Sequence, residues 1–240
     1  MLEYPVDLKL CFENCLTCPF LSFSLLDKLD SPSLELLNRH KSMVSYKSGE
    51  LLYREGTKIQ GLNLIKSGKI KVFKTSHRGN ELILSLRKSV NFLGLADLLL
   101  HTHHHSSAMA LEDTEICILD KEPFIKIFKS NPLFSLRISE YLARVLESTQ
   151  NHFLNLTQRH MRGRLAYALI YLNDFFGKRE GDSYINLSLK RADLAALTNL
   201  TTANVIRTLT SFEDESLIEV NGRDIRILDV AKLQLVCEMN

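Results

Sequence analysis

Cysteine is the residue type whose spacing in this chain most directly suggests chemistry. Three of the five cysteines, Cys11, Cys15 and Cys18, lie close together near the N-terminus in the spacing C-x3-C-x2-C. Clustered thiols in a reducing compartment are typical of metal binding or redox chemistry. On a helix, however, the same spacing would form one small apolar stripe that ends before Pro19. Both interpretations follow from the spacing.

A second group of possible metal ligands is the histidine run at residues 101–105, which consists of His101, His103, His104 and His105. Adjacent histidines rarely point at a single ion, so we expect a solvated loop between two strands. The sequence contains no motif that pairs a nucleophile with a base, and no glycine-rich phosphate loop. We therefore do not expect an enzyme.

The strongest structural pattern lies between Leu189 and Leu209 and predicts two short crossed helices with a turn at Asn199. Thr201 is placed to cap the second helix. The apolar residues that would hold the two helices together are Leu194, Leu197, Leu200, Val205 and Leu209. This pattern predicts a helix-turn-helix, whose second helix enters the major groove of DNA. The alternative is a pair of core helices in another all-α domain.

The predicted recognition helix has a face that its packing residues leave free. Its candidate DNA-binding residues are Thr201, Thr202, Ala203, Asn204, Ile206 and Arg207. A hairpin is expected from Leu217 to Leu228, since Asn221-Gly222 suits a tight turn between two alternating strands. In this predicted wing, Arg223 and Arg226 are candidates for phosphate contacts, or they are ordinary solvated strand residues.

The middle of the chain predicts the scaffold that would position these groups. Residues 41–120 alternate apolar and polar side chains between regularly spaced glycines, which predicts a β-roll. After Pro132 a long helix is expected, with a seam that steps by four and three residues through Ile138, Leu142, Val145, Thr149, His152 and Leu156. The seam predicts a dimerisation helix whose pairing is weaker and adjustable at its polar residues. The alternative is a helix that lies on the roll of its own chain, which would need a similar apolar stripe.

Length and composition fit this division. The chain has 240 residues, 45% apolar content and a formal net charge of +2, which is too small to indicate nucleic acid by itself. We predict an α+β fold with a cysteine-bearing segment at 1–30, a β-roll at 31–130, a dimerisation helix at 131–160 and a winged helix-turn-helix at 161–240. No run of 18 apolar residues and no secretory signal is visible, so we expect a cytoplasmic protein.

Taken together, these features resemble the Crp/Fnr family of bacterial transcription regulators over nearly the whole chain. The resemblance is carried by the helix-turn-helix and by the segments Ser48–Leu52 and Ile65–Lys71. It implies a cyclic-nucleotide-binding-like roll and a homodimer on palindromic double-stranded DNA. RNA polymerase would be a further partner if the protein is an activator. Arg207 matches the family arginine that contacts a guanine, whereas Ala203 and Ile206 differ from the residues that relatives often use.

The family includes cyclic-nucleotide sensors, which carry a Gly-Glu pair followed by an arginine and a serine or threonine. In the corresponding stretch here, residues 92–108, the glutamate is absent and no arginine lies between Arg87 and Arg137. A buried phosphate would lack its cation, so we do not expect cyclic AMP as the ligand. A small organic effector, heme or a protein partner in the roll domain is the alternative, with structural cysteines.

The family also includes oxygen and nitric-oxide sensors of the Fnr type, which hold a [4Fe–4S] cluster. The resemblance implies the metal ligands Cys11, Cys15, Cys18 and Cys117, since four thiolates are the usual set. Ser24 stands where the family pattern has a further cysteine, so Cys11 or a non-cysteine ligand would have to complete the set. Zinc on the same thiolates is a chemical alternative. We take Cys237 as structural or incidental.

Overall fold

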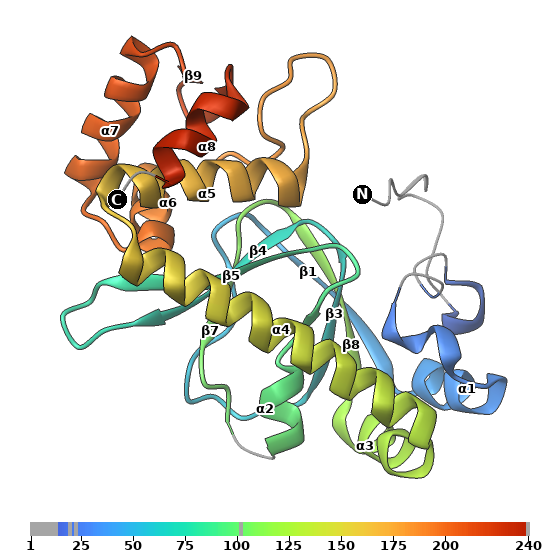
Figure 1. The fold of residues 1–240 in the computed structure, drawn as a ribbon. Helices are drawn as coiled ribbons and strands as arrows, with labels where there is room; N and C mark the ends of the chain where they lie inside the picture. Colours follow the sequence, from blue (N-terminus) through green and yellow to red (C-terminus); the bar gives the residue numbers. More distant parts are fainter. Residues whose placement is uncertain (1–13, 19–20, 22–23, 101–102, 239–240) are drawn as a thin grey trace. The chain divides into compact units, whose positions relative to one another are not determined.

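The computed structural model describes residues 14–18, 21, 24–100 and 103–238 (Figure 1). Its helices are η1 (Cys15–Thr17), η3 (Leu25–Lys28), α1 (Ser31–Arg39), α2 (Leu95–Leu100), α3 (Lys121–Ser130), α4 (Pro132–Gln158), α5 (Met161–Phe176), α6 (Arg191–Thr198), α7 (Thr202–Asp214) and α8 (Val230–Glu238). Its strands are β1 (Lys41–Tyr46), β2 (Leu51–Tyr53), β3 (Gly61–Ser67), β4 (Lys69–Thr75), β5 (Glu81–Lys88), β6 (Phe92–Leu93), β7 (Ser107–Ala110), β8 (Thr114–Asp120), β9 (Ile218–Asn221) and β10 (Asp224–Ile227).

Contacts divide the chain into two units. The first unit comprises residues 1–73 and 86–146, and the second comprises residues 74–85 and 147–240. The predicted fold class is confirmed, because the chain consists of a β-roll, a long helix and a C-terminal winged helix-turn-helix. The predicted domain limits stay a prediction.

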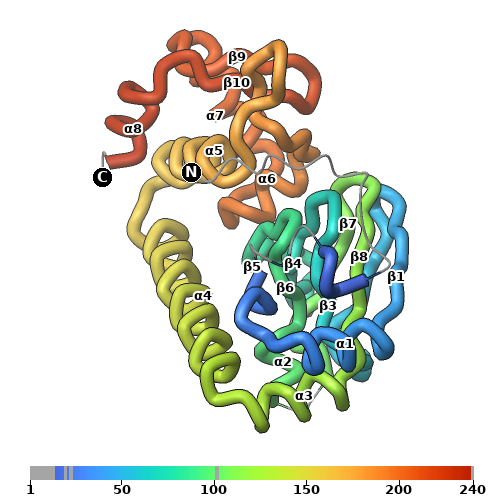
Figure 2. The backbone as a smooth tube through the Cα atoms, turned by 90° about the vertical axis from the view of Figure 1, so that its right-hand side faces the viewer, coloured from blue at the N-terminus to red at the C-terminus, as the bar shows by residue number. Residues whose placement is uncertain are grey.

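The roll is made of two four-stranded antiparallel sheets (Figures 1 and 2), with strand orders β1-β8-β3-β6 and β2-β7-β4-β5. Successive side chains of a strand point to opposite faces of its sheet. On β8, Ile116 and Ile118 belong to the interior of the roll, while Cys117 and Leu119 face outward. The alternation predicted from the sequence therefore produces two cores, one on each face of the same sheet.

The two cores differ in composition. The inner core, inside the roll, contains Ile65, Ile70, Leu93, Ala108 and Ile116. The outer core is larger and joins the outward face of the sheet to helices α1, α3 and the start of α4, with Leu37, Leu62, Leu64, Leu119, Phe124, Phe134 and Ile138 among its residues. Cys15 is part of this outer core, so the N-terminal segment is anchored to the outside of the roll.

One glycine fixes the approach of two roll strands. Gly68 joins β3 to β4 with a φ of +97°, and a Cβ atom there would lie 2.2 Å from Oγ1 of Thr114. Any side chain at Gly68 would therefore push β8 away from this turn, and its backbone conformation would be strained as well. The glycine spacing that predicted a roll has a steric cause at this position.

In the second unit, the helix-turn-helix forms as the sequence predicts. Asn199 ends α6 in the left-handed conformation with a φ of 50°, and Oγ1 of Thr201 accepts a hydrogen bond from the backbone N–H of Asn204 at 3.2 Å. Val205 and Leu209 are buried on the inner side of α7. The wing follows as the hairpin β9–β10, with Asn221 and Gly222 between the strands.

The long helix α4 carries the predicted seam, and the structure gives its residues different surroundings. Ile138 is 1% exposed and belongs to the outer core, and Leu142 packs against that core. Of the other seam residues, Thr149 is exposed. The remaining three are half-buried: Val145, His152 and Leu156. The N-terminal end of the seam therefore packs within its own chain, as the alternative of a helix on the roll requires. Pairing of two chains through this seam stays a prediction.

Outside the seam, α4 carries five exposed large apolar residues: Leu133, Leu136, Leu146, Phe153 and Leu154. Leu146 and Phe153 are seven residues apart, and Ala143 is also exposed, so these residues share one face of the helix. Among the described helices, none is long and apolar enough to cross a membrane.

Candidate nucleic-acid interface and cysteine pocket

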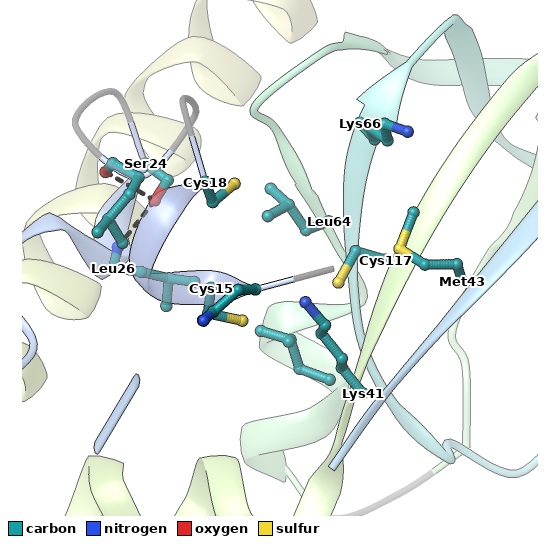
Figure 3. Close-up of a pocket in the computed structure, with 12 residues that line it drawn as sticks. Cys15, Cys18, Ser24, Leu26, Lys41, Met43, Leu64, Lys66 and Cys117 are labelled. Atoms are coloured by element: carbon teal, nitrogen blue, oxygen red, sulfur yellow. Dashed lines mark hydrogen bonds between the residues drawn. The ribbon is translucent and has the colours of Figure 1, made fainter. Parts of the chain in front are cut away.

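Three of the predicted metal ligands line one pocket on the outward face of the roll (Figure 3). Cys15 and Cys18 come from the segment around η1, and Cys117 comes from β8, 99 residues later in the sequence. We call this site the cysteine pocket; it is lined by Asn14, Cys15, Cys18, Leu21, Ser24, Leu26, Lys41, Met43, Leu64, Lys66, Cys117 and Leu119. The fold thus brings together thiols that the sequence places far apart.

The N-terminal side of the cysteine pocket is fixed by hydrogen bonds. The backbone N–H of Cys15 donates to Oδ1 of Asn38 on α1 at 2.9 Å, and Oδ1 of Asn14 caps η1 by accepting from the backbone N–H of Leu16. Cys15 is 7% exposed. Its position is therefore supported by α1 and by the outer core.

Burial and a nearby lysine set the protonation of the thiols. Removal from water raises the pKa of Cys117 to about 12 and raises the pKa of Cys15 as well, because a buried thiolate is poorly solvated. Lys41 acts in the opposite direction on both pKa values, and it also hydrogen-bonds Cys15. Figure 3 places the Lys41 side chain between Cys15 and Cys117. The sequence analysis did not identify this lysine.

Ser24 lies in the cysteine pocket but is committed to another role. Its hydroxyl donates to the carbonyl of Leu21 at 3.1 Å and accepts from the backbone N–H of Leu26 at 3.1 Å, so it caps η3. The side chain is buried at 8% exposure. A residue that satisfies two backbone groups in this way is a structural cap and a poor source of a fourth metal ligand.

The donor set fits a thiolate-bound metal in kind, because soft thiolates favour iron–sulfur clusters and zinc. As they stand, no three His, Cys, Asp or Glu side chains among the described residues are arranged to hold a metal ion. The remaining predicted ligand, Cys11, lies outside the described residues. Cys237 is buried on α8 of the second unit and does not line the cysteine pocket.

The predicted recognition helix α7 presents the expected face. Thr202, Ala203 and Arg207 are exposed and Ile206 is 49% exposed. The opposite face of the helix is buried. Nη2 of Arg207 donates to Oδ1 of Asn204 at 2.5 Å, so Asn204 holds the guanidinium along the helix. Thr201 is occupied as the helix cap. The candidate contacts to base edges are therefore Thr202, Ala203, Ile206 and Arg207.

The two arginines of the predicted wing differ. Arg226 faces Glu219 across the hairpin, forms an ion pair with it and lies over the ring of Tyr184 at 5.4 Å. Arg223 is exposed next to the turn. Of the two, Arg223 retains the geometry of a phosphate contact, and Arg226 is engaged in holding the wing together.

Two further arginines hold the interface in place, and the sequence analysis missed their role. Arg191 opens α6 and donates from Nη2 to the carbonyl of Gly222 at 2.8 Å, which ties the helix to the wing. Arg164 on α5 donates to the carbonyl of Asn199 at 3.1 Å, at the turn of the helix-turn-helix. A cation at a helix N-terminus is opposed by the helix dipole, so Arg191 at that position was a signal of another partner.

The histidine run differs from the expected solvated loop. Although His105 is exposed, His104 is 5% exposed and stacks on Tyr53 with ring centroids 3.7 Å apart. A Cβ atom at Gly94 would lie 3.2 Å from Cε1 of His104, so this ring covers the glycine of the stretch 92–108. The expectation of a solvated loop is wrong for His104, because the ring fills space inside the roll.

Comparison with known families identifies both parts of the chain. Residues 43–131 match the family model described as cyclic nucleotide-binding domain. Residues 163–236 match the model described as Crp-like helix-turn-helix domain. The two matches correspond to the roll and to the winged helix-turn-helix described above.

Similar proteins extend over most of the chain. "Electron transport regulator A" of Shewanella oneidensis is 28% identical over 229 residues, which cover 94% of this chain and 88% of the relative. "Fumarate and nitrate reduction regulatory protein" of Vibrio cholerae is 27% identical over 225 residues, covering 93% of this chain and 87% of the relative. The solved structure of FixK2 from Bradyrhizobium japonicum covers 83% of this chain and 98% of its own, with a TM-score of 0.75 and 19% identity, and supports the fold.

Proposed function

Because the chain belongs to the Crp/Fnr family of transcription regulators and carries its DNA-binding helix-turn-helix, we propose that its DNA binding responds to oxygen or nitric oxide through a metal centre in the cysteine pocket. The observation that carries the proposal is the convergence of Cys15, Cys18 and Cys117 from distant segments on one pocket. Cys15 is buried, and Cys18 and Cys117 are half-buried. Lys41 lines the same pocket, and four thiolates hold a [4Fe–4S] cluster.

The proposed ligands are Cys15, Cys18 and Cys117, with Cys11 as the fourth. When bound, a [4Fe–4S] cluster supplies sensitivity to oxygen and nitric oxide. Each thiol must lose its proton to become a ligand, and burial opposes that loss. Lys41 favours the thiolates, and together with Lys66 it offers positive charge to an anionic centre. Lys66 also pairs with Glu115 at 2.7 Å, so Lys41 is the main source of this compensation.

The same thiolates would hold zinc, which prefers tetrahedral sulfur sites. A zinc centre has no redox chemistry, so it would stabilise the N-terminal segment without sensing oxygen. The two metals therefore predict different behaviour of DNA binding in air.

For DNA binding, the proposal is that two chains pair and present their α7 helices to successive major grooves of a palindromic site. The exposed apolar residues of α4, with Leu146 and Phe153 on one face, support pairing with a second copy. RNA polymerase is the further partner if the protein is an activator, and the proposed location is the cytoplasm.

Base reading is proposed to rest on two residues of α7. A guanidinium such as that of Arg207 can bind a guanine through two hydrogen bonds, and the exposed Ile206 can contact a thymine methyl group. Ala203 offers no acceptor to a cytosine. The preferred site should therefore differ from the half-site of relatives that carry an arginine or glutamate at the positions of Thr202 and Ala203 and a small residue at the position of Ile206.

Control by the metal centre is a population shift. The metal-bound protein must favour the DNA-competent dimer by a few kcal/mol for loss of the centre to release DNA. Cys15 is held by α1 and the outer core. The change on metal loss is therefore expected mainly at Cys18.

The deciding experiment is an absorbance spectrum of protein purified without oxygen, with iron and acid-labile sulfide assays and DNA affinity measured before and after exposure to air. We expect a broad band near roughly 400 nm that bleaches in air, about four irons per chain, and a parallel loss of DNA affinity. A colourless protein that binds zinc and keeps its DNA affinity in air would support the structural-metal alternative. A protein that takes up neither metal after reconstitution would overturn the proposal.

A further inference from the structure

The side chain of Asn204 lies beside the guanidinium of Arg207 on α7. Nη2 of Arg207 donates to Oδ1 of Asn204 at 2.5 Å, and the two residues are three positions apart, which places them on one face of the helix. Arg207 is exposed and Asn204 is half-buried. A short side chain close to the helix therefore holds the end of a long one, which would otherwise sample many rotamers.

The backbone of Asn204 is fixed by the cap of the same helix. Oγ1 of Thr201 accepts a hydrogen bond from the backbone N–H of Asn204 at 3.2 Å, and the next residue, Val205, is fully buried. Consecutive contacts thus run from the cap through Asn204 to the guanidinium of Arg207. They link the guanidinium to the N-terminal turn of α7, and the N-terminal residues of a recognition helix are those that contact base edges.

An arginine on a DNA-facing helix has two kinds of partner. Its N–H groups bind a phosphate as well as a guanine, and only the guanine contact carries sequence information. The residues one helical turn before Arg207 are Ala203 and Asn204, which are neighbours of Arg207 at spacings of four and three. Ala203 has no side-chain acceptor, so Asn204 is the residue of this turn that can direct the guanidinium.

The amide of Asn204 carries no charge, and this matters for the arginine that it holds. An amide oxygen accepts one hydrogen bond and leaves the guanidinium with its positive charge and its other N–H donors. A carboxylate at the same position would form an ion pair with Arg207 and would place negative charge near the phosphates of DNA. The amide therefore orients the arginine without reducing its attraction to DNA.

We propose that Asn204 is a positioning residue that directs Arg207 to a base instead of a phosphate. This role rests on the base reading proposed above for Arg207. With Asn204 present, the guanidinium is held at the N-terminal turn of α7, where it binds guanine through two hydrogen bonds. Without the amide, Arg207 is released to the phosphate backbone, a contact that binds DNA of any sequence. Asn204 thus sets the selectivity of α7 more than its affinity for DNA.

The test is a selection of binding sites from a random duplex DNA library, with the anaerobically purified full chain and its Asn204→Ala and Arg207→Ala variants. At the base pair whose preference Arg207→Ala loses, we expect Asn204→Ala to reduce the preference for guanine by about tenfold. Affinity for mixed-sequence DNA should be maintained in Asn204→Ala. The dependence of its log affinity on log salt should steepen by about one, because Arg207 gains a phosphate contact.

Two further variants distinguish positioning from a structural role. Asn204→Asp keeps an acceptor of the same size, so the guanine preference should persist while affinity for all sequences falls. Thr210→Ala, at an exposed position one turn after Arg207, is the matched control and should change neither preference nor salt dependence.

Thermal unfolding checks that Asn204→Ala is folded. Alanine at this position keeps the backbone N–H that Thr201 caps and has a higher helix propensity than asparagine. Loss of the guanine preference in Asn204→Asp as well as in Asn204→Ala would overturn the role of the acceptor oxygen.

A double-mutant cycle separates this role from the proposed function. In the Arg207→Ala background, Asn204→Ala should not change base preference further, because the two side chains act as one unit. An independent loss of preference in that background would show that Asn204 contacts a base itself, against the proposal. If Arg207→Ala changes base preference and Asn204→Ala does not, base reading by Arg207 stands and the positioning role is overturned. If Arg207→Ala changes no base preference, both fail.

Discussion

The cysteine pocket and the recognition helix hold their functional groups in opposite ways. Cys15 is buried and Cys117 is half-buried. Removal from water raises the pKa values of both thiols, so they must lose protons before they can bind a metal. On α7, Arg207 is exposed, and Asn204 accepts a hydrogen bond from its guanidinium. The pocket therefore depends on pH and metal supply, whereas the helix depends on salt concentration and base sequence.

This difference indicates which part of the molecule is able to respond to a signal. The DNA-reading surface is held by internal hydrogen bonds, including the arginine contacts at its turn and its wing. The cysteine pocket has the right donors but no arrangement of three described side chains that holds an ion by itself. A site that is completed only by a ligand can change state when the ligand is lost, and a preformed site cannot do so as easily.

The largest expected effect is at Cys117. Cys117→Ser replaces the thiol with a hydroxyl that does not ionise near neutral pH, so we expect anaerobically purified protein to lose essentially all bound iron. Cys237→Ser, at a buried cysteine of the second unit, is the matched control and should keep the iron content of the parent. Iron assay and the absorbance spectrum measure both. Equal iron in the two variants would remove Cys117 from the ligand set.

On the DNA-reading side, the largest effect is expected at Arg207. Arg207→Ala should remove about 1–3 kcal/mol of discrimination at a single base pair, because the bidentate contact to guanine is lost. Selection of binding sites from a random DNA library, compared with the parent, checks this. A uniform loss of affinity without a change in base preference would mean that Arg207 contacts a phosphate.

A substitution at Ser24 tests whether this position serves as a helix cap or can supply a metal ligand. Ser24→Cys should lower the stability of the metal-free protein by about 0.5–2 kcal/mol, since a thiol is a poor cap for η3. In anaerobic protein the added thiol should slow the loss of iron to a chelator. Chemical denaturation and chelator kinetics measure the two effects. Faster iron loss than in the parent would show that the cap matters more to the pocket than an extra thiol.

The pH dependence of the metal-free protein tests the burial of Cys117. The pKa of this thiol is raised from its ordinary value near 9 to about 12 in the folded protein. Below about pH 9 the thiol is protonated in both states and has no effect. Above it the unfolded chain ionises first, so stability should fall by up to about 1.4 kcal/mol per pH unit.

This slope is measured by urea unfolding at pH values from about 8 to about 10.5, which bracket the thiol pKa of the unfolded chain. Cys117→Ala should remove the additional slope, although other groups titrate in both proteins. Identical slopes in parent and variant would contradict a strongly buried thiol.

The smallest effect is expected at the wing. Arg223→Ala should weaken binding to all DNA sequences alike and reduce the dependence of log affinity on log salt by about one, because one phosphate contact is lost. Arg226→Ala should instead lower the stability of the wing, since Arg226 is paired with Glu219. Affinity titrations at several salt concentrations distinguish these outcomes.

The sequence was most informative where structure is local. The caps and apolar spacing of residues 189–209 were enough to predict the helix-turn-helix, because Asn199 and Thr201 act within one turn of the chain. The hairpin also follows from its Asn-Gly turn. Its register could have been extended from that turn, which would have placed Arg226 opposite Glu219 and separated it from Arg223.

Contacts that depend on strand pairing or on tertiary packing were not accessible in this way. The convergence of Cys15, Lys41 and Cys117 requires the pairing of β1 with β8, and the burial of His104 requires a loop to fold into the roll. For the long helix, periodicity located a stripe at Ile138 but could not indicate whether the stripe packs on its own chain or on another.

Strand β8 has a consequence for how this protein can vary. Because Cys117 faces one compartment and Ile118 the other, a substitution at either position alters one wall and leaves the other side chain in place. A one-residue insertion or deletion in the strand would exchange both walls at once. Point substitutions can therefore diversify the two compartments independently over evolution, and changes in strand length cannot.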